Sequence, residues 1–399
     1  MSSQAISNRM NVLAQTSQHL SQFEQSLYIP MRDRPGMLDF TFGNPHELPL
    51  PELVDELHRQ LEPEHANWFA YTMNDPAARE SVANMLWEWR EIRFQPADIA
   101  LTTGAFSALA VALKAVTDPS DEVIINTPPW FFYELLSVEA GLVPVKVQQD
   151  LESLELDLDA IEAAISPLTR MIIVNTPCNP TGKIYSSATL LRLADILETA
   201  SARNGRTIYI LSDEPYSRIV FDNKQFVSPT AFYPNTLLSY SYGKALLAPG
   251  QRIGFLALPP TMPHRDEIRR NIFLAQLGNG YAFPNSIMQY ALGKLGELSI
   301  DVSHLQHKRD WLVRALREMG YSVHVPEGTF YLLVKSPLED DVEFARLLAQ
   351  EKILVLSGTI AEIPGYFRIS LTATDEMIER SLPGFANAIA RTRQAMLVA

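Results

Sequence analysis

Residues 171–182 read Met-Ile-Ile-Val-Asn-Thr-Pro-Cys-Asn-Pro-Thr-Gly, an apolar run that ends in a turn sequence with two prolines. Four consecutive apolar residues bounded by turn residues are typical of a strand that is buried on both faces of a parallel sheet. The same pattern recurs at Glu122–Asn126, before Thr127-Pro128-Pro129, and at Ile208–Leu211, before Ser212-Asp213. We therefore predict a mostly parallel sheet whose strands end in polar loops.

Helical segments alternate with such runs over residues 45 to about 260, a pattern that indicates an α/β domain. After residue 260 the helices are longer and the strands fewer, which is typical of a smaller α+β domain. In the first region we expect helices at Pro51–Leu61, Ala77–Trp89 and Ala105–Val116, and further strands at Leu237–Tyr240 and Ile253–Leu258. In the second we expect helices at Arg265–Leu298 (interrupted near Gly278–Pro284), at Val302–Met319 and from Val342, and strands at Ser322–Val325, Gly328–Val334 and Phe367–Leu371.

The first 40 or so residues are polar and are broken by Pro30 and Pro35-Gly36, so they form either a flexible tail or an arm that packs on a partner subunit. They lack the apolar core of a signal peptide. The longest uncharged stretch, Asn271–Gly293, contains Asn, Gln, Gly and Pro and is therefore a poor membrane helix. We expect a soluble cytoplasmic protein.

Composition excludes several classes of partner. The 399 residues include 33 basic and 46 acidic side chains, a net charge of −13, without a basic run. Such a chain is a poor ligand for nucleic acid or an anionic membrane. The single cysteine, Cys178, cannot form an internal disulfide, which favours a reducing compartment. The eight histidines show no metal-binding spacing, so no metal site is expected.

Chemically useful side chains follow the predicted strands. In open α/β sheets ligands bind beyond the carboxyl ends of the strands. Asp213 could pair there with a protonated ring nitrogen, or could cap a helix. Lys244 lies on the short turn Ser241-Tyr242-Gly243-Lys244, where a dry pocket would make its amine a nucleophile towards aldehydes. The alternative for Lys244 is an ordinary surface lysine.

Three further features are suited to anions. Arg252 has the planar fork that binds phosphate, and Ser241 offers a hydroxyl to the same anion. The segment Thr103-Gly104-Ala105-Phe106-Ser107 leads directly into a helix, whose first amides bind anions. Arg368 interrupts an apolar strand pattern, so it is either paired internally or binds a carboxylate.

Three other side chains could contact a ring. Two prolines stiffen the loop around Asn179, which could hold its amide against a ligand. Tyr216 could hydrogen-bond a phenolate oxygen, or could be a half-buried aromatic. Trp130 could offer a stacking surface, or could pack in the core. We expect Cys178 to be a small buried residue without a catalytic role.

These segments together resemble the class I/II aminotransferases of fold type I, which use pyridoxal 5'-phosphate. The resemblance covers about Phe42 to Thr374. It rests on Asn179-Pro180-Thr181-Gly182, Asp213-Glu214-Pro215-Tyr216, Ser241-Tyr242-Gly243-Lys244, Gly250-Gln251-Arg252-Ile253-Gly254 and Phe367-Arg368-Ile369-Ser370.

The resemblance implies an α/β fold: a three-layer large domain with a mostly parallel sheet, plus a smaller α+β domain. We assign residues 1–44 to an N-terminal arm and the start of the small domain, 45–285 to the large cofactor-binding domain and 286–399 to the C-terminal small domain. The resemblance also implies a homodimer with its active sites at the interface. A dimer favours the interpretation of the first 40 or so residues as an arm that packs on the partner subunit.

The resemblance also implies three catalytic residues. Lys244 would bond to the cofactor's aldehyde and later carry a proton between substrate and cofactor. Asp213 would keep the pyridine nitrogen protonated, so that the ring accepts electrons. Tyr216, together with Asn179, would hydrogen-bond the ring's phenolate oxygen.

The other binding residues follow from the same resemblance. Trp130 would stack on the ring and border the substrate, and Arg368, with Asn179, would bind the substrate's α-carboxylate. Gly43 would contact that carboxylate through its backbone, and Tyr71 would reach the phosphate of the neighbouring subunit. The cofactor's phosphate would be held by Ser241, Arg252 and the amides of Ala105 and Phe106.

The sequence departs from the family at three places. Pro76 stands where the family usually has Gly, five residues after Tyr71. Phe106 stands where some dicarboxylate-specific relatives have Lys, and Leu274–Phe283 is apolar where others supply Arg. An apolar, aromatic or neutral side chain on the substrate is therefore favoured, although Arg269 and the adjacent Arg270 keep an acidic one open.

The predicted activity is transamination between an L-amino acid and a 2-oxo acid by a ping-pong mechanism, in amino acid metabolism. One alternative is a pyridoxal-phosphate-dependent lyase, synthase or oxidase on the same scaffold. An alternative of another class is a non-enzymatic protein that binds the cofactor. The expected partners are the two substrates and a second copy of the chain, without nucleic acid or membrane.

Overall fold

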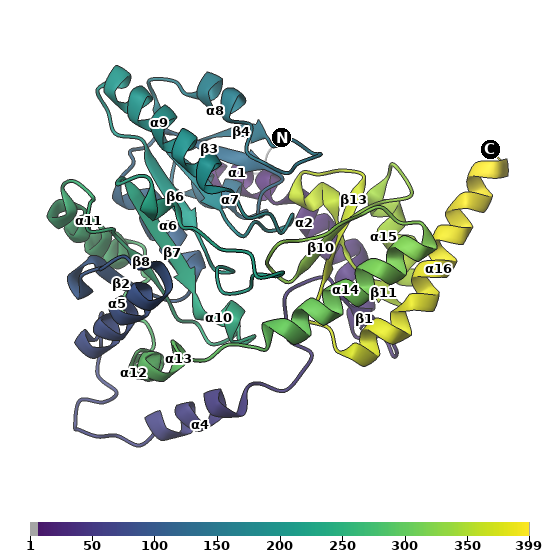
Figure 1. Ribbon diagram of the computed structural model, residues 1–399, viewed down its shortest axis with the longest axis horizontal. Helices are drawn as coiled ribbons and strands as arrows, with labels where there is room; N and C mark the ends of the chain where they lie inside the picture. Colours follow the sequence, from purple (N-terminus) through teal and green to yellow (C-terminus); the bar gives the residue numbers. More distant parts are fainter. Residues whose placement is uncertain (1–6, 399) are drawn as a thin grey trace.

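A seven-stranded sheet forms the centre of the large domain in the computed structural model, which describes residues 7–398 (Figure 1). The strand order is β2-β8-β7-β6-β5-β3-β4, and β8 runs in the opposite direction to the other six strands. The predicted mostly parallel sheet is confirmed. The strands are β2 (Ile99–Thr102), β3 (Glu122–Thr127), β4 (Val143–Gln148), β5 (Thr169–Asn175), β6 (Tyr209–Asp213), β7 (Thr236–Ser241) and β8 (Gly254–Ala257).

Helices cover both faces of this sheet, which makes three layers. Adjacent residues of β3 show this: Ile124 packs in the cluster that contains α9, whereas Val123 and Ile125 pack in the cluster that contains α6 and α11. Because alternate side chains of a strand point to opposite faces, both faces need apolar residues, as the continuous apolar runs predicted. The helices around this sheet are α4 (Pro51–Gln60), α5 (Pro76–Arg90), α6 (Ala105–Ala115), α7 (Tyr133–Glu139), α8 (Leu158–Ala164), α9 (Ser187–Asn204), α10 (Tyr242–Ala245), α11 (Arg265–Gly278), α12 (Ser286–Tyr290) and α13 (Leu292–Leu295).

Two strands of the seven-stranded sheet escaped the sequence analysis. β4 lies at the edge of the sheet, where half-exposed residues and Pro144 remove the continuous apolar signal. β2 is only four residues long and pairs antiparallel with β8 at the other edge. The predicted break in the helical stretch after Arg265 is confirmed, since α11 ends at Gly278 and α12 begins at Ser286.

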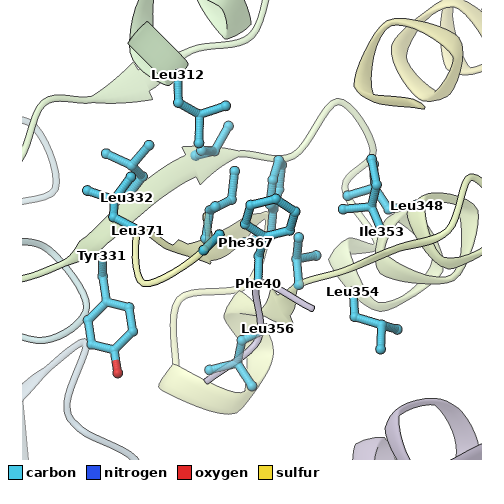
Figure 2. Close-up of a cluster of buried hydrophobic side chains, with 14 of the residues drawn as sticks. Phe40, Leu312, Tyr331, Leu332, Leu348, Ile353, Leu354, Leu356, Phe367 and Leu371 are labelled. Atoms are coloured by element: carbon cyan, nitrogen blue, oxygen red, sulfur yellow. The ribbon is translucent and has the colours of Figure 1, made fainter. Parts of the chain in front are cut away.

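The smaller domain is built on the antiparallel sheet β12-β13-β10-β9, which is flanked by helices. Phe40, from the start of the chain, joins Leu332, Leu356 and Phe367 in its buried core (Figure 2). The elements are β1 (Leu38–Asp39), β9 (Val323–His324), β10 (Tyr331–Lys335), β11 (Ile353–Leu354), β12 (Leu356–Ser357), β13 (Tyr366–Ser370), α14 (Val302–Met319), α15 (Asp341–Gln350) and α16 (Asp375–Val398), with β1 parallel to β11.

The N-terminal segment is helical from Asn8 to Arg32, so a flexible tail is the wrong description of these residues. Its apolar side chains Phe23, Leu27 and Tyr28 are buried in the core of the small domain. Figure 1 shows α1 and α2 where the two domains meet. Residues 1–6 of the predicted arm lie outside the described part of the chain. The segment comprises α1 (Asn8–Thr16), α2 (Gln18–Phe23), a π-helical turn (Glu24–Tyr28) and α3 (Ile29–Arg32).

Within residues 7–398, no helix combines the length and the hydropathy needed to cross a bilayer.

Candidate active site

A cavity of about 290 Å³ opens at the carboxyl ends of β5, β6 and β7 and is closed on its other side by residues of the small domain. All but one of the predicted site residues line it. From the sequence analysis these are Gly43, Ala105, Phe106, Trp130, Asn179, Asp213, Tyr216, Ser241, Lys244, Arg252 and Arg368.

Asp213 is the last residue of β6 and is buried. Burial raises the pKa of this carboxyl to about 6, whereas hydrogen bonds from Tyr133 and Ser239 and the charge of Lys244 oppose the rise. The Tyr133 hydroxyl donates to Asp213 Oδ2 at 2.6 Å, and Ser239 Oγ donates to Oδ1 at 3.4 Å. Two donors thus hold a carboxylate at the strand end, where it can face a cationic ring nitrogen.

Tyr133 was not predicted from the sequence. It follows Trp130 by three residues, at the start of α7, and an aromatic run there was the only local signal. Burial raises the pKa of Tyr133 well above its usual value, so the hydroxyl keeps its proton and can donate.

Lys244 lies in α10, the short helix that follows β7. The rings of Tyr216 and Phe330 each have their centroid 5.7 Å from Lys244 Nζ. Burial raises the pKa of Tyr216 far above its usual value, so this phenol also remains a neutral donor. The preceding Gly243 is required by packing, since a Cβ there would lie 3.0 Å from Pro249 Cα.

Arg252 lies across the beginning of α6. Gly104 precedes this helix with φ +83°, and a Cβ at Gly104 would lie 2.7 Å from Arg252 Nη2. The guanidinium donates to the carbonyl of Pro249 at 2.7 Å and forms no ion pair within residues 7–398. Burial lowers the pKa of Arg252. A half-buried cation beside unpaired helix amides is a site for a dianion such as phosphate.

Arg368 projects from β13 and is buried. Its Nη1 donates to Asn179 Oδ1 at 2.8 Å and its Nη2 to the Thr41 carbonyl at 2.9 Å. The guanidinium stacks on the Tyr331 ring, 3.8 Å from the centroid, and its buried Nε has no partner within residues 7–398. Every partner is neutral, and burial lowers the pKa of Arg368. A carboxylate is the ligand that such a group lacks.

Trp130 packs among aromatic side chains, and its stacking on a ring stays a prediction. It lines the cavity and packs against Phe106, Phe132 and Tyr133, with ring centroids 5.1, 5.2 and 5.3 Å away. Gly43 lines the cavity as well, and a Cβ there would lie 2.5 Å from the Phe330 ring. Glycine is therefore needed at position 43 for this close packing against Phe330.

Tyr71 is the predicted site residue that the structure leaves outside the cavity of its own chain. Its side chain is exposed and its ring lies 5.2 Å from that of Phe283. Arg269 is also elsewhere, because it pairs with Asp98 and Asp266. Cys178 is buried, as expected. Leu20, Glu24, Phe42, Phe131 and Tyr331 line the cavity without having been predicted.

Comparison with known proteins agrees with this geometry. The family described as "Aminotransferase class I and II" matches residues 35–383. The chain belongs to this family. It is 31% identical over 337 residues to an aspartate/prephenate aminotransferase of Cereibacter sphaeroides, which covers 78% of this chain and 81% of the relative.

Solved structures of aminotransferases superpose on nearly the whole chain. An amino transferase from Eubacterium rectale matches with a TM-score of 0.85 and 29% identity, over 97% of this chain and 96% of that one. An aspartate aminotransferase from Thermotoga maritima matches with a TM-score of 0.82 and 25% identity, over 96% and 99%. The protein is therefore an aminotransferase of fold type I.

The cofactor of this enzyme is pyridoxal phosphate, as in its family, and the cavity fits it. The unpaired Arg252 and the first amides of α6 suit the dianionic phosphate. The buried carboxylate of Asp213 suits a ring nitrogen that carries a proton. Lys244, which lines the same cavity, would supply the amine that the cofactor's aldehyde requires.

Proposed function

We propose that the enzyme moves the amino group of an L-amino acid with an apolar, aromatic or neutral side chain to a 2-oxo acid. The observation that carries this proposal is one cavity that gathers Lys244, Asp213 and two guanidinium groups, Arg252 and Arg368, without carboxylate partners in residues 7–398. Because the cavity has one lysine and one receptor for an α-carboxylate, the donor and the acceptor have to occupy it in turn. This favours a ping-pong cycle.

Each residue then has a defined task. Bound pyridoxal phosphate supplies an electron sink for the charge that develops at the substrate's Cα. Lys244 holds the cofactor between turnovers and moves the proton at Cα. Asp213 stabilises positive charge at the ring nitrogen, and Tyr216 and Asn179 donate to the ring oxygen. Arg368 fixes the α-carboxylate and so sets which Cα bond is activated.

The phosphate and ring contacts complete the assignment. Ser241, Arg252 and the amides of Ala105 and Phe106 hold the phosphate, and Trp130 covers the ring. The substrate's side chain meets an apolar wall. Phe106, Leu109, Phe131 and Phe132 line the cavity. This wall supports an apolar, aromatic or neutral substrate rather than the aspartate that appears in the relatives' names.

We also propose a homodimer in which Tyr71 reaches the partner's phosphate site. Tyr71 is 89% exposed and lines one surface hollow together with Phe69 (63% exposed) and Phe283 (46% exposed). Exposed aromatic residues in one patch mark an interface. Light scattering should give twice the chain mass, and Tyr71→Ala should weaken cofactor retention. A monomer with full activity would contradict this assignment.

A panel of amino donors and 2-oxo acids tests the function. The enzyme should convert donors with apolar, aromatic or neutral side chains to their 2-oxo acids while its spectrum changes from the pyridoxal to the pyridoxamine form. Adding only a 2-oxo acid should reverse the spectral change. Release of ammonia, or a product that is not an oxo acid, would instead favour a lyase, synthase or oxidase.

A further inference from the structure

The N-terminal segment contributes a charged residue to the cavity. Glu24 is the first residue of the π-helical turn, and Leu20 lies one helical turn before it; both line the cavity, as do Phe42 and Phe131. π-helical turns concentrate at functional sites. Buried Phe23 and Leu27 on either side of Glu24 anchor the segment in the core of the small domain.

The segment is also tied to the body of the small domain through a hydrogen bond. The Tyr28 hydroxyl donates to Asp39 Oδ2 at 2.8 Å, and the Tyr28 ring packs edge-on against Phe42, with centroids 5.0 Å apart. Asp39 belongs to β1, which pairs with β11. Glu24 is therefore held at the cavity by residues on both sides of it, rather than by a loose terminus.

The carboxylate of Glu24 has no internal partner. Within residues 7–398 it forms neither a hydrogen bond nor an ion pair. Leu20, Phe42 and Phe131, which line the same cavity, are apolar and each pack against the small-domain core. An acceptor in apolar surroundings gains most from a ligand that donates a hydrogen bond to it.

The cations of the cavity are already engaged. Among the described residues that line the cavity, the cationic side chains are Lys244, Arg252 and Arg368. The proposed function assigns Lys244 to the reacting amine, Arg252 to the phosphate and Arg368 to the α-carboxylate. A second carboxylate on the substrate would thus meet Glu24 without a compensating cation. Like charges at close range in a partly buried site are strongly unfavourable.

We propose that Glu24 is a specificity residue, and that the preferred substrate is an amino acid whose apolar or aromatic side chain ends in a hydrogen-bond donor rather than in a carboxylate. This inference rests on the proposed function, because it takes Arg368 as the receptor of the α-carboxylate. It distinguishes glutamine from glutamate and tyrosine from phenylalanine, pairs that differ only in the group presented to Glu24.

Binding without turnover tests the proposal. Glutarate and its monoamide lack the amino group, so they occupy the substrate site of the holoenzyme without reacting. Calorimetry should show that the monoamide binds roughly tenfold or more tightly than glutarate. Glu24→Gln and Glu24→Leu should each reduce this preference to about threefold or less. Glu198→Gln, an equal charge change on the exposed side of α9, should leave the preference unchanged.

Steady-state kinetics supply the second measurement. The wild type should have a higher kcat/KM for glutamine than for glutamate and for tyrosine than for phenylalanine. Glu24→Leu should remove both preferences, mainly through the KM of the favoured member of each pair.

The outcomes separate the two proposals. Glutarate that binds as tightly as its monoamide to the wild type, or a preference that survives in both Glu24 variants, would overturn the role of Glu24. An equal loss for all four amino acids would also overturn it, because Glu24 would then only cover the cavity. Absence of amino transfer with every donor would instead contradict the proposed function, since the calorimetric preference does not depend on turnover.

Discussion

The cavity has two walls of different origin. The sheet wall carries Asn179, Asp213 and Lys244, each placed at or shortly after the end of a buried strand of one sheet. The outer wall combines Leu20 and Glu24 of the N-terminal segment with Arg368 of β13. A sheet fixes the sheet wall through its backbone, whereas the outer wall depends on how separate segments pack. We infer that cofactor chemistry depends on the sheet wall and substrate choice on the outer wall.

The largest effect should come from the sheet wall. Lys244→Ala removes the group that moves the proton at Cα, so kcat should fall roughly 10⁴-fold or more. Rapid-mixing absorbance with one donor measures this loss. Lys294→Ala, on an exposed pair with Glu297, serves as the control and should retain full activity. A Lys244→Ala enzyme that keeps its rate would remove the catalytic assignment.

The second-largest effect should come from the outer wall, as an increase in KM. Arg368→Leu removes a buried guanidinium that offers charge-assisted hydrogen bonds, so KM should rise about a hundredfold. Cofactor retention after dialysis should remain close to that of the wild type, because Arg368 faces the substrate. Equal KM values for variant and wild type would show that Arg368 is a structural residue.

Substitutions at two glycines distinguish steric crowding at the phosphate site from backbone strain. Gly104 and Gly205 both have positive φ, but only at Gly104 would a Cβ collide with Arg252; nothing lies within 4 Å at Gly205. Gly104→Ala should weaken cofactor binding by roughly tenfold, whereas Gly205→Ala should only reduce stability, by about 1 kcal/mol. Fluorescence titration of the apoenzyme measures both affinities. Equal affinities in the two variants would contradict the phosphate role of Arg252.

The smallest effect concerns the proton on Asp213. Its pKa in the unliganded chain is about 6, so the carboxyl becomes neutral as the pH falls through 6 and cofactor affinity should fall with it. Tyr133→Phe removes a hydrogen bond that lowers this pKa, so the loss should begin at a higher pH, by less than about one unit. Tyr209→Phe on the same strand is the control. If cofactor affinity depends on pH in the same way in Tyr133→Phe and in the wild type, this hydrogen bond does not tune the pKa of Asp213.

The sequence predicted the sheet wall better than the outer wall for a physical reason. Asn179 and Lys244 stand in contiguous motifs next to apolar strands, so local pattern and local structure coincide. Tyr133 reaches Asp213 across 80 positions, and no local pattern reports such a contact. Glu24 reads as one polar residue in a polar lead-in, because only the packing of Phe23 and Leu27 brings it to the cavity.

The edge strands were missed for a related reason. β4 contains Pro144 and partly exposed residues, so its sequence lacks the continuous apolar run of the central strands. The position of Glu24 and the pairing of the edge strands therefore depend on contacts between residues far apart in the sequence, which a local sequence pattern does not show.

Chemical trapping of the coloured holoenzyme tests the central claim most directly. Borohydride should bleach the visible absorbance and leave the cofactor bonded to one side chain, and mass spectrometry of the digested protein should locate it on the peptide that contains Lys244. A cofactor attached to another lysine, or a purified chain that neither carries nor takes up pyridoxal phosphate, would contradict the account.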